Sequence, residues 1–200
     1  MLLRAFGKSA AMLIFFLDID PVVAASLVPN GHMRLVVECG QIFDGVLWFH
    51  SGSQGKAPGY ANHPFTVWVR ESSWAWDWCM EFARAIACVE YPNRYAEKKR
   101  SHHGSWDRIR LMNKPSTWKY TTMEETPLCP LPAAVANQSI TATTHAMRAI
   151  QFRIYHVSHK NKDRHQFLYE PRARRPKYLP ARTPIQEEIV QRHKKKLKIN

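Results

Sequence analysis

The chain has 200 residues, 45% of them hydrophobic and 12% aromatic, which is enough apolar side chain for a core and excludes a wholly disordered protein. Its longest uncharged apolar stretch, Ala10–Leu17, falls short of the roughly 18 residues that a membrane span needs, so we expect no membrane association. Residues 1–90 hold 6 basic and 8 acidic residues, a net of −2, whereas residues 91–200 hold 23 and 8, a net of +15. Such a basic half favours a polyanionic partner, most often nucleic acid.

Cysteine and histidine spacing gives no sign of a metal or disulfide framework. The four cysteines, Cys39, Cys79, Cys88 and Cys129, lie far apart and form no C-x-x-C pair. We therefore expect dispersed buried thiols in a reducing compartment. His156 and His159 share a helix face, but no cysteine stands at ligand spacing beside them, so the sequence predicts no metal site and no cofactor.

The N-terminal residues 1–11 precede a second methionine, Met12, and we interpret them as an extension or a misassigned start. A secretory signal with Ala10–Leu17 as its apolar region is an alternative, which would make the protein a secreted cationic one. Against it, Asp18 and Asp20 stand between that region and the small-residue cleavage site.

The first predicted elements are short. Met12–Leu17 is apolar and aromatic, which indicates a buried strand or an extended segment. Asp20 then predicts an N-cap and Pro21 the first residue of a helix that runs through Leu27. Pro, Asn and Gly at 29–31 are expected to break it.

Helical spacing returns from His32 to Phe43, with one apolar stripe along it. Gly40 inside this helix indicates close packing or a ligand near the backbone. Four glycines and a proline after position 44 predict a loop over residues 44–61.

The clearest predicted helix follows, and Pro92 is expected to end it. We interpret its large apolar residues as core; they recur every three or four positions at Trp74, Trp78, Phe82, Ile86 and Val89. Residues 98–140 are expected to be irregular and carry a basic cluster. A further helix is predicted from Thr144 to Lys160, with an apolar stripe at Met147, Ile150, Ile154 and Val157.

Basic and aromatic residues interleave toward the C-terminus, from Phe152 to Tyr178. Arginine and lysine neutralise phosphates, and aromatic faces stack on unpaired bases, so this pattern is typical of nucleic-acid binding. An ordinary exposed basic face beside core aromatics would look the same. The basic residues that we expect at such an interface are Arg70, Arg94, Arg153, Lys160, Arg172, Arg174, Arg175 and Lys177.

Glu38 is the most interesting single carboxylate. It is predicted to lie mid-helix, between Val36, Val37 and Cys39, with Arg34 one turn before it. Burial would raise its pKa and the arginine would lower it. A surface Glu–Arg pair is the plainer interpretation. His63, beside Asn62, is a candidate proton donor or phosphate contact. A helix-capping Asn62 with a hydrogen-bonded His63 is the plainer interpretation.

Five segments of the chain carry a recognisable pattern: MLIFFLDIDPVVAA (12–25), RLVVECGQ (34–41), YANHPFTVWVRES (60–72), EYPNRY (90–95) and FRIYHVSHK through RRPKY (152–178). The pattern is a basic residue four positions before a Glu, a Gln three after it, and then N-H-P and a Trp. In these segments the chain resembles a group of small, often phage-encoded proteins, and the layout is similar to pyrimidine-dimer DNA glycosylases of the phage endonuclease V type.

The resemblance implies an enzyme that removes a damaged pyrimidine from DNA and then cuts the abasic site. The nucleophile would be the α-amino group of the mature N-terminus, at Met12 in this frame, which forms an imine with the sugar C1′. Glu38 would stabilise cationic sugar character and move protons. Arg34, Gln41, Asn62 and His63 would be its polar neighbours.

The chain departs from the pattern at three places. Leu13 follows Met12 where the family has a small residue, Gly31 stands where a histidine is expected seven positions before Glu38, and Arg34 is the one arginine near that glutamate.

The sequence therefore predicts a mainly α protein. We expect an extension at 1–11, one compact glycosylase-like helical domain over 12–180 that begins with a short apolar segment, and a basic tail at 181–200. Its predicted activity is that of a DNA glycosylase with abasic-site lyase chemistry, in the cytoplasm of a host cell. The predicted partner is DNA or RNA, and no obligate protein partner is evident. The alternative is a non-catalytic nucleic-acid-binding phage protein.

Overall fold

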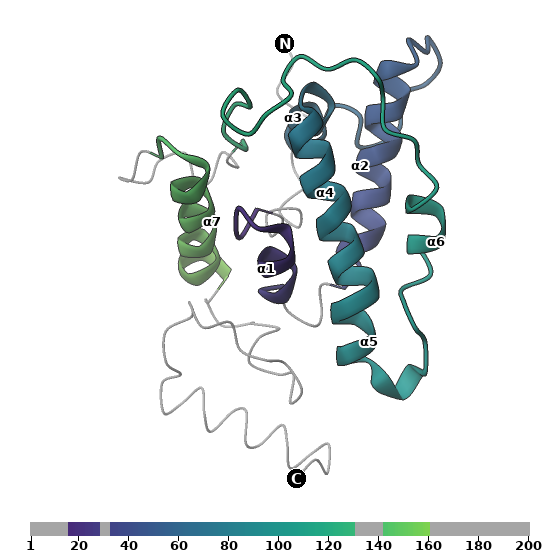
Figure 1. Ribbon diagram of the computed structural model, residues 1–200, viewed down its shortest axis with the longest axis vertical. Coiled ribbons are helices and arrows are strands. Elements are labelled where there is room, and N and C mark those ends of the chain that lie inside the picture. The colour runs from purple at the N-terminus through teal and green to yellow at the C-terminus, as the bar shows by residue number, and fades with distance from the viewer. Residues whose placement is uncertain (1–15, 29–32, 131–141, 161–200) are drawn as a thin grey trace.

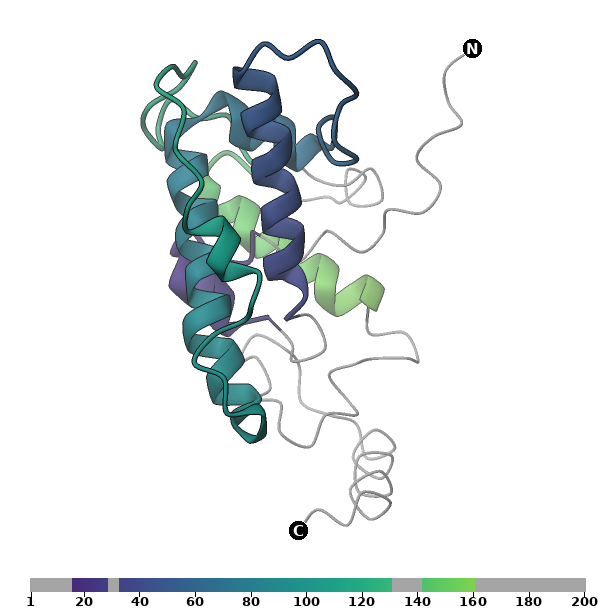
Figure 2. The same cartoon turned by 90° about the vertical axis from the view of Figure 1, so that its right-hand side faces the viewer.

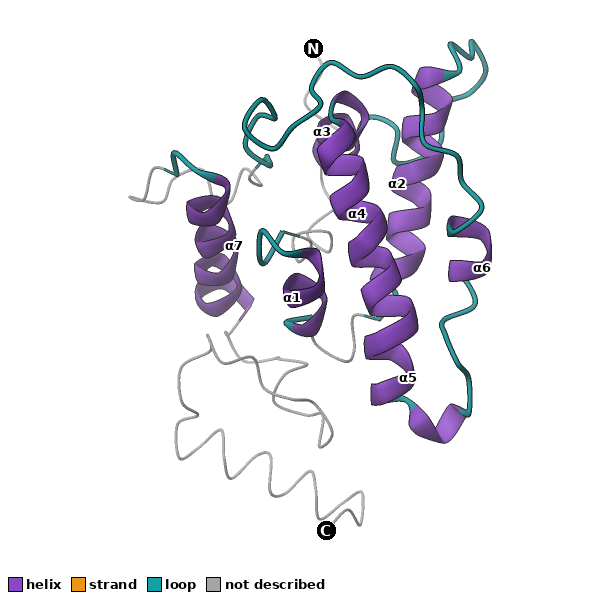
Figure 3. Cartoon of the chain, viewed as in Figure 1, coloured by secondary structure: helices purple, strands orange, loops and turns teal. Residues whose placement is uncertain are grey.

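A computed structural model of the chain describes residues 16–28, 33–130 and 142–160. Within these ranges the regular structure is helical, as predicted (Figure 3). No helix in this part of the chain is long and apolar enough to cross a membrane. The predicted extension at 1–11, the residue Met12 and the tail at 181–200 lie outside the described residues.

Two long helices, α2 (Leu35–His50) and α4 (Ser73–Ala85), run side by side, and α3 (Pro64–Glu71) packs on α2 near their upper end (Figure 1). The short helix α1 (Pro21–Ser26) packs on the other side of α4. In Figure 1, α1 lies between α4 and α7 (His145–Lys160).

Aromatic rings form the centre of the core, and Phe16 connects them. Phe16 is fully buried, and its ring centroid lies 5.0 Å from that of Trp78 and 5.6 Å from that of Trp68. It also contacts Phe152 of α7, at 6.4 Å. Edge-to-face and tilted pairs of this kind contribute about 0.5–1.5 kcal/mol each beyond the burial of their area. Phe16 and Leu17, the described residues of the apolar N-terminal segment, are therefore part of the core and do not lie in a strand.

The first helix is confirmed. The carboxylate of Asp20 accepts hydrogen bonds from the backbone N–H groups of Val22 (2.8 Å) and Val23 (3.1 Å), and Pro21 is the first helical residue. Leu27 is the C-cap. Both features were expected because an acidic N-cap satisfies free N–H groups while proline needs no acceptor there.

The loop predicted from residue 44 was wrong over its first seven residues, because α2 continues to His50. Gly45 lies inside the helix: a Cβ there would come within 2.8 Å of Thr66 and 2.9 Å of the backbone of Ala61. The glycine therefore allows α2 and α3 to approach closely and does not mark a turn. Gly40 has the close packing that the sequence predicted, since a Cβ there would meet Arg108 at 2.7 Å.

Pro92 does not end the fourth helix, contrary to expectation. Its path continues through a π-helical turn, η2 (Ile86–Glu90), into α5 (Tyr91–Arg94), which contains Pro92 near its start. Pro92 has no N–H to donate, and the carbonyl of Ala87, five residues before it, accepts instead from His103 N (3.0 Å). The predicted aromatic stripe is core except at its end, where Val89 is exposed.

The chain then returns along the outer side of α4 (Figures 1 and 2). This segment is irregular, as predicted, except for the short helices η3 (Ala96–Lys98) and α6 (Trp106–Ile109). Tyr120 anchors its return: its N–H donates to Glu71 O (3.0 Å) and its carbonyl accepts from Ser73 N (2.9 Å). Further along, Trp68 Nε1 donates to the carbonyl of Pro127 (2.7 Å).

The last helix has the predicted bounds, but a different face is buried. Ile150, placed on the core stripe by its spacing, is 48% exposed, while Ala149 and Phe152 are buried. His145 is buried too, and its ring lies 4.9 Å from that of Trp74. Aromatic partners in the N-terminal half of the chain set the orientation of α7, which a local apolar pattern cannot reveal. Ile154 and Val157 have no described side chains.

Candidate functional site

Glu38 lies in the first turn of α2, and its side chain is only 12% exposed. One carboxylate oxygen, Oε1, lies 3.9 Å from Nε of Arg34, whose side chain is 64% exposed. The other oxygen, Oε2, is buried and has no hydrogen-bond partner. Buried polar atoms are nearly always paired, so an enclosed and unpartnered carboxylate oxygen is a feature that requires an explanation.

The pKa of Glu38 is raised, first because burial disfavours its charged form; the positive charge of Arg34 acts in the opposite direction but more weakly. Both opposing effects were predicted, burial from a mid-helix position among apolar residues and the lowering from Arg34 one turn before; the glutamate lies in the first turn of α2 instead, because that helix begins at Leu35. A carboxyl group with a raised pKa exchanges protons closer to neutral pH, which is the property a general acid or base needs.

His63 begins α3 and does not contact that carboxylate. Its Nδ1 accepts a hydrogen bond from the backbone N–H of Phe65 (3.2 Å), so the histidine itself is the N-cap. Burial lowers the pKa of His63. Asn62, the residue expected to cap, is exposed. In this conformation the histidine is therefore neutral and hydrogen-bonded, as the plainer sequence interpretation held, but His63 itself is the cap that this interpretation assigned to Asn62.

The Asn62–His63 segment meets α2 well beyond the glutamate. Ala61, next to it, contacts Gly45. Gly45 is seven residues after Glu38, which corresponds to about 10 Å along a helix axis. Of the predicted polar neighbours, Arg34 is thus beside Glu38, whereas His63 and Asn62 lie further along the same helix. Gln41 is half-buried on α2, one turn after Glu38.

Two of the predicted nucleic-acid contacts have internal partners. Arg94 is 9% exposed; it pairs with Glu90 (2.6 Å) and donates to the carbonyls of Ser26 (3.0 Å) and Val28. Arg153 donates to the carbonyl of Leu17 (2.6 Å) and pairs with Asp18. In this conformation both guanidinium groups connect distant parts of the chain. The side chains of Lys160, Arg172, Arg174, Arg175 and Lys177 lie outside the described residues.

The cysteines are free thiols, and all but the half-buried Cys88 are buried. Burial raises the pKa of Cys39 and Cys129 well above the ordinary thiol value. Because a thiolate is the reactive form, these buried cysteines are poor nucleophiles. Among the described residues no group of three His, Cys, Asp or Glu side chains could hold a metal ion.

No known protein family, curated protein or solved structure matches this chain. The candidate site therefore depends on its own geometry and on the sequence pattern around Glu38.

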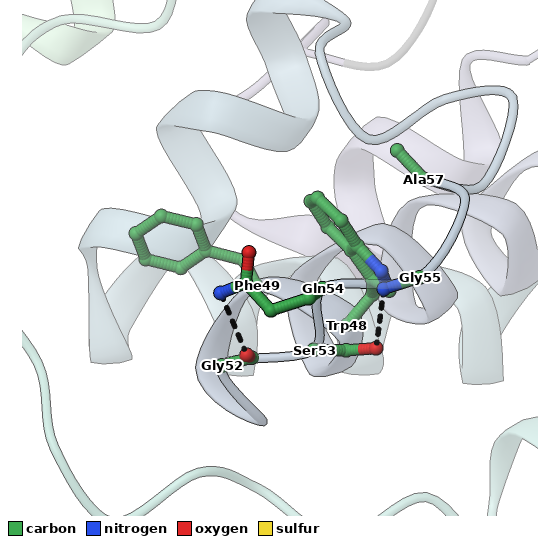
Figure 4. A pocket seen from close by; sticks show the side chains of 7 residues that line it. All are labelled: Trp48, Phe49, Gly52, Ser53, Gln54, Gly55 and Ala57. Atoms are coloured by element: carbon green, nitrogen blue, oxygen red, sulfur yellow. Dashed lines mark hydrogen bonds between the residues drawn. The ribbon is translucent and has the colours of Figure 1, made fainter.

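A second group of residues, at the opposite end of α2, was not singled out from the sequence. The guanidinium carbon of Arg70 lies 4.2 Å from the centroid of the Phe49 ring. Phe49 also lines an open pocket with its neighbour Trp48 and the loop that follows (Figure 4). The sequence signal for this group is a tryptophan next to a phenylalanine, shortly before a glycine-rich loop. Because the loop was predicted to start at residue 44, both aromatic residues were assigned to it and not to the end of α2. Arg70 was predicted as a nucleic-acid contact.

Proposed function

We propose that the protein is a DNA-binding, glycosylase-like enzyme that acts on damaged or modified pyrimidines, with Glu38 as its catalytic carboxylate. The observation that supports this most directly is the enclosed Oε2 atom of Glu38, which has no partner in the protein. A structural Glu–Arg pair would satisfy both oxygens or leave them in water. An oxygen kept dry and unpaired is instead suited to a group that the substrate supplies.

The carboxylate would act on the sugar of an extruded nucleotide. As the bond between C1′ and the base breaks, its electrons leave with the base and the sugar gains positive charge, which an adjacent anion stabilises. An amine then bonds to C1′ and gives an imine after the sugar ring opens. The imine makes the C2′ proton acidic, and loss of that proton expels the 3′ phosphate. By the family resemblance, the amine would be the N-terminal group near Met12, which lies outside the described residues.

The surroundings of Glu38 suit this chemistry in charge. The positive charge of Arg34 favours the ionised form of the Glu38 carboxyl group. The Arg34 side chain is also exposed enough to contact a phosphate. Extruding a nucleotide costs a few kcal/mol, least at damaged pairs, so a site that requires extrusion would favour lesions.

The test uses DNA duplexes with one defined lesion, first a pyrimidine dimer or a uracil and then an abasic site, with strand cleavage as the readout. Borohydride added during the reaction reduces the imine to a stable amine and links protein to DNA. We expect Glu38→Gln to reduce cleavage about 10²- to 10⁴-fold with little change in DNA affinity. Glu81→Gln, an exposed glutamate on α4 paired with Arg84, is the matched control. Absence of cleavage and of trapped product with all three substrates would refute the enzyme.

A non-catalytic nucleic-acid-binding protein is the second candidate, and one observation favours it. The returning segment 98–119 is largely exposed and basic, with Lys98, Lys99, Arg100, Arg108, Arg110, Lys114 and Lys119. Such a protein would bind DNA with an affinity that falls steeply with salt and does not respond to Glu38→Gln. Under either proposal the protein would act in the cytoplasm of a host cell.

A further inference from the structure

The pocket at the C-terminal end of α2 has a volume of about 450 Å³ and is open to solvent. Trp48 and Phe49 provide its aromatic part, and the rest of the lining comes from the loop residues Gly52, Ser53, Gln54, Gly55 and Ala57. Gly52 takes a positive φ of 64°, which lets the chain turn back beside the helix end. Figure 4 shows the Trp48 indole turned toward Ala57 and the Phe49 ring projecting to the other side of the loop.

Phe49 is 46% exposed, whereas the other phenylalanines of the described residues are all buried. One face of its ring is covered by the guanidinium of Arg70. The Arg70 backbone is held in place because its carbonyl contacts Nε2 of His50 at 2.8 Å. This contact connects the Arg70 backbone to the end of α2, and the guanidinium lies over the Phe49 ring without any ligand.

Arg70 has no acidic partner among the described residues, and its Nε is buried without an acceptor. The indole Nε1 of the adjacent Trp48 is in the same state. The sequence from Gly45 to Arg70 contains no Asp or Glu, and the exposed Lys56 lies in sequence between the lining residues Gly55 and Ala57. Exposed aromatic surface, two unsatisfied donors and a local excess of positive charge therefore occur together.

From these features we infer that the pocket binds an unpaired nucleobase presented by a single-stranded nucleic acid, whose backbone phosphate contacts Arg70. An aromatic ring accepts any base by stacking, and an arginine beside it supplies the charge for the phosphate. Arg70 Nε and Trp48 Nε1 have no acceptor in the protein, and oxygens of a base or a phosphate are suitable acceptors.

This site is distinct from the one around Glu38. Ten residues of one helix separate Glu38 from Trp48, about 15 Å along the axis. A single nucleotide cannot occupy both positions. The inference therefore does not depend on the proposed enzyme activity, and the base in this pocket is a bound one and not a reacting one.

The experiment measures binding of undamaged 12-nucleotide oligomers by fluorescence anisotropy. One oligomer is oligothymidine and the other has the same phosphate backbone without bases. The full chain is expected to bind oligothymidine more tightly. Phe49→Leu should weaken that binding about 5- to 100-fold and leave binding of the baseless oligomer unchanged. Ala57→Leu, which fills the pocket from its opposite wall and keeps Phe49, should do the same.

Arg70→Gln is expected to weaken both oligomers and to reduce the slope of log affinity against log salt by about 1. Ile150→Ala, which removes an exposed apolar side chain on α7, and Arg84→Gln, which removes an exposed cation on α4, are the controls. If free thymidine monophosphate competes with the oligomer, one nucleotide is sufficient for binding. If only oligomers compete, the connected strand is needed. If both pocket variants bind oligothymidine like the original protein, the inference is wrong; because no cleavage is measured, the enzyme proposal would be unaffected.

Discussion

Arg34 Nε lies 3.9 Å from Glu38 Oε1, one helical turn away, which is an ion-pair distance and too long for a hydrogen bond. The arginine therefore compensates the charge of the carboxylate only partly. Oε2 has no compensation from the protein. As a result, burial outweighs the arginine and the pKa of Glu38 is raised.

The raised pKa predicts that Glu38→Gln increases stability at neutral pH. A carboxyl group whose pKa is higher in the folded state favours folding below its unfolded pKa, near 4.3, and loses that contribution as pH rises through the folded pKa. Removal of the charge should raise the free energy of unfolding at pH 7 by about 1 kcal/mol. Urea unfolding at several pH values between 4 and 8 measures this.

The comparison in that experiment is Glu81→Gln, which removes an exposed carboxylate on α4. It should leave the pH dependence of stability unchanged. If Glu38→Gln instead lowers stability at pH 7, the carboxylate holds the fold together and the argument for a catalytic group loses its main support.

Arg94 should be a stabilising residue. Its guanidinium joins α5 to the end of α1 through Ser26 and Val28, and it pairs with Glu90. Arg94→Met leaves Glu90 and these carbonyls without their donor, so we expect a loss of about 3 kcal/mol. The exposed pair Arg84–Glu81 gives the comparison: Arg84→Met should cost less than about 1 kcal/mol.

The same variant tests the earlier sequence interpretation of Arg94 as a nucleic-acid contact. DNA affinity is measured well below the unfolding temperature, where the variant is folded. We expect it to be unchanged. A clear drop in affinity without a drop in stability would show that Arg94 leaves its internal partners to bind DNA.

Local signals in the sequence were sufficient where short-range chemistry decides the structure. Asp20 and Pro21 predicted the start of α1, because capping involves only neighbouring residues. The spacing of Arg34 and Glu38 likewise predicted both their pairing and the opposing effects on the glutamate pKa. The bounds of α7 followed from its periodic pattern.

Contacts between distant segments decided the rest. Gly45 looks like a loop residue until Thr66 and Ala61 are seen against it. Ile150 looks like a core residue until Phe152 is found packing on Phe16. The pocket beside Phe49 could not be predicted, because Arg70 comes from another helix and the sequence gives no register between the two.

The neutral state of His63 predicts a dependence of stability on pH. Its Nδ1 accepts the N–H of Phe65 only when unprotonated, and burial lowers the pKa of the histidine below its ordinary value. A histidine with a lowered folded pKa stabilises the protein above its unfolded pKa, near 6.5, and this contribution is lost as pH falls through the folded pKa. His63→Ala should cost about 1 kcal/mol at pH 7.5 and less at pH 5.

His63→Asn supplies the control, since asparagine caps a helix without titrating in this range. We expect the His63→Asn variant to be about as stable as the original protein at pH 7.5. Its free energy of unfolding should fall less on acidification. His103 contributes a second dependence, because its Nδ1 accepts from Ser105 N (3.2 Å) and burial, with nearby positive charge, lowers its pKa as well. An unchanged acid response in the His63→Asn, His103→Asn double variant would exclude both as its source.

The two glycines of α2 should respond differently to alanine. At Gly45 the new Cβ would meet the Ala61 backbone at 2.9 Å, and neither helix can yield without separating α2 from α3. We expect Gly45→Ala to cost about 1–3 kcal/mol.

At Gly40 the closest atom belongs to the flexible end of Arg108, which can move away and give up its exposed pair with Asp44 (2.7 Å). There the gain in helix propensity, up to about 1 kcal/mol, offsets the lost pair, so Gly40→Ala should be nearly neutral. Thermal unfolding of the two variants measures the difference, and equal losses at both positions would contradict the close approach of α2 and α3 at Gly45.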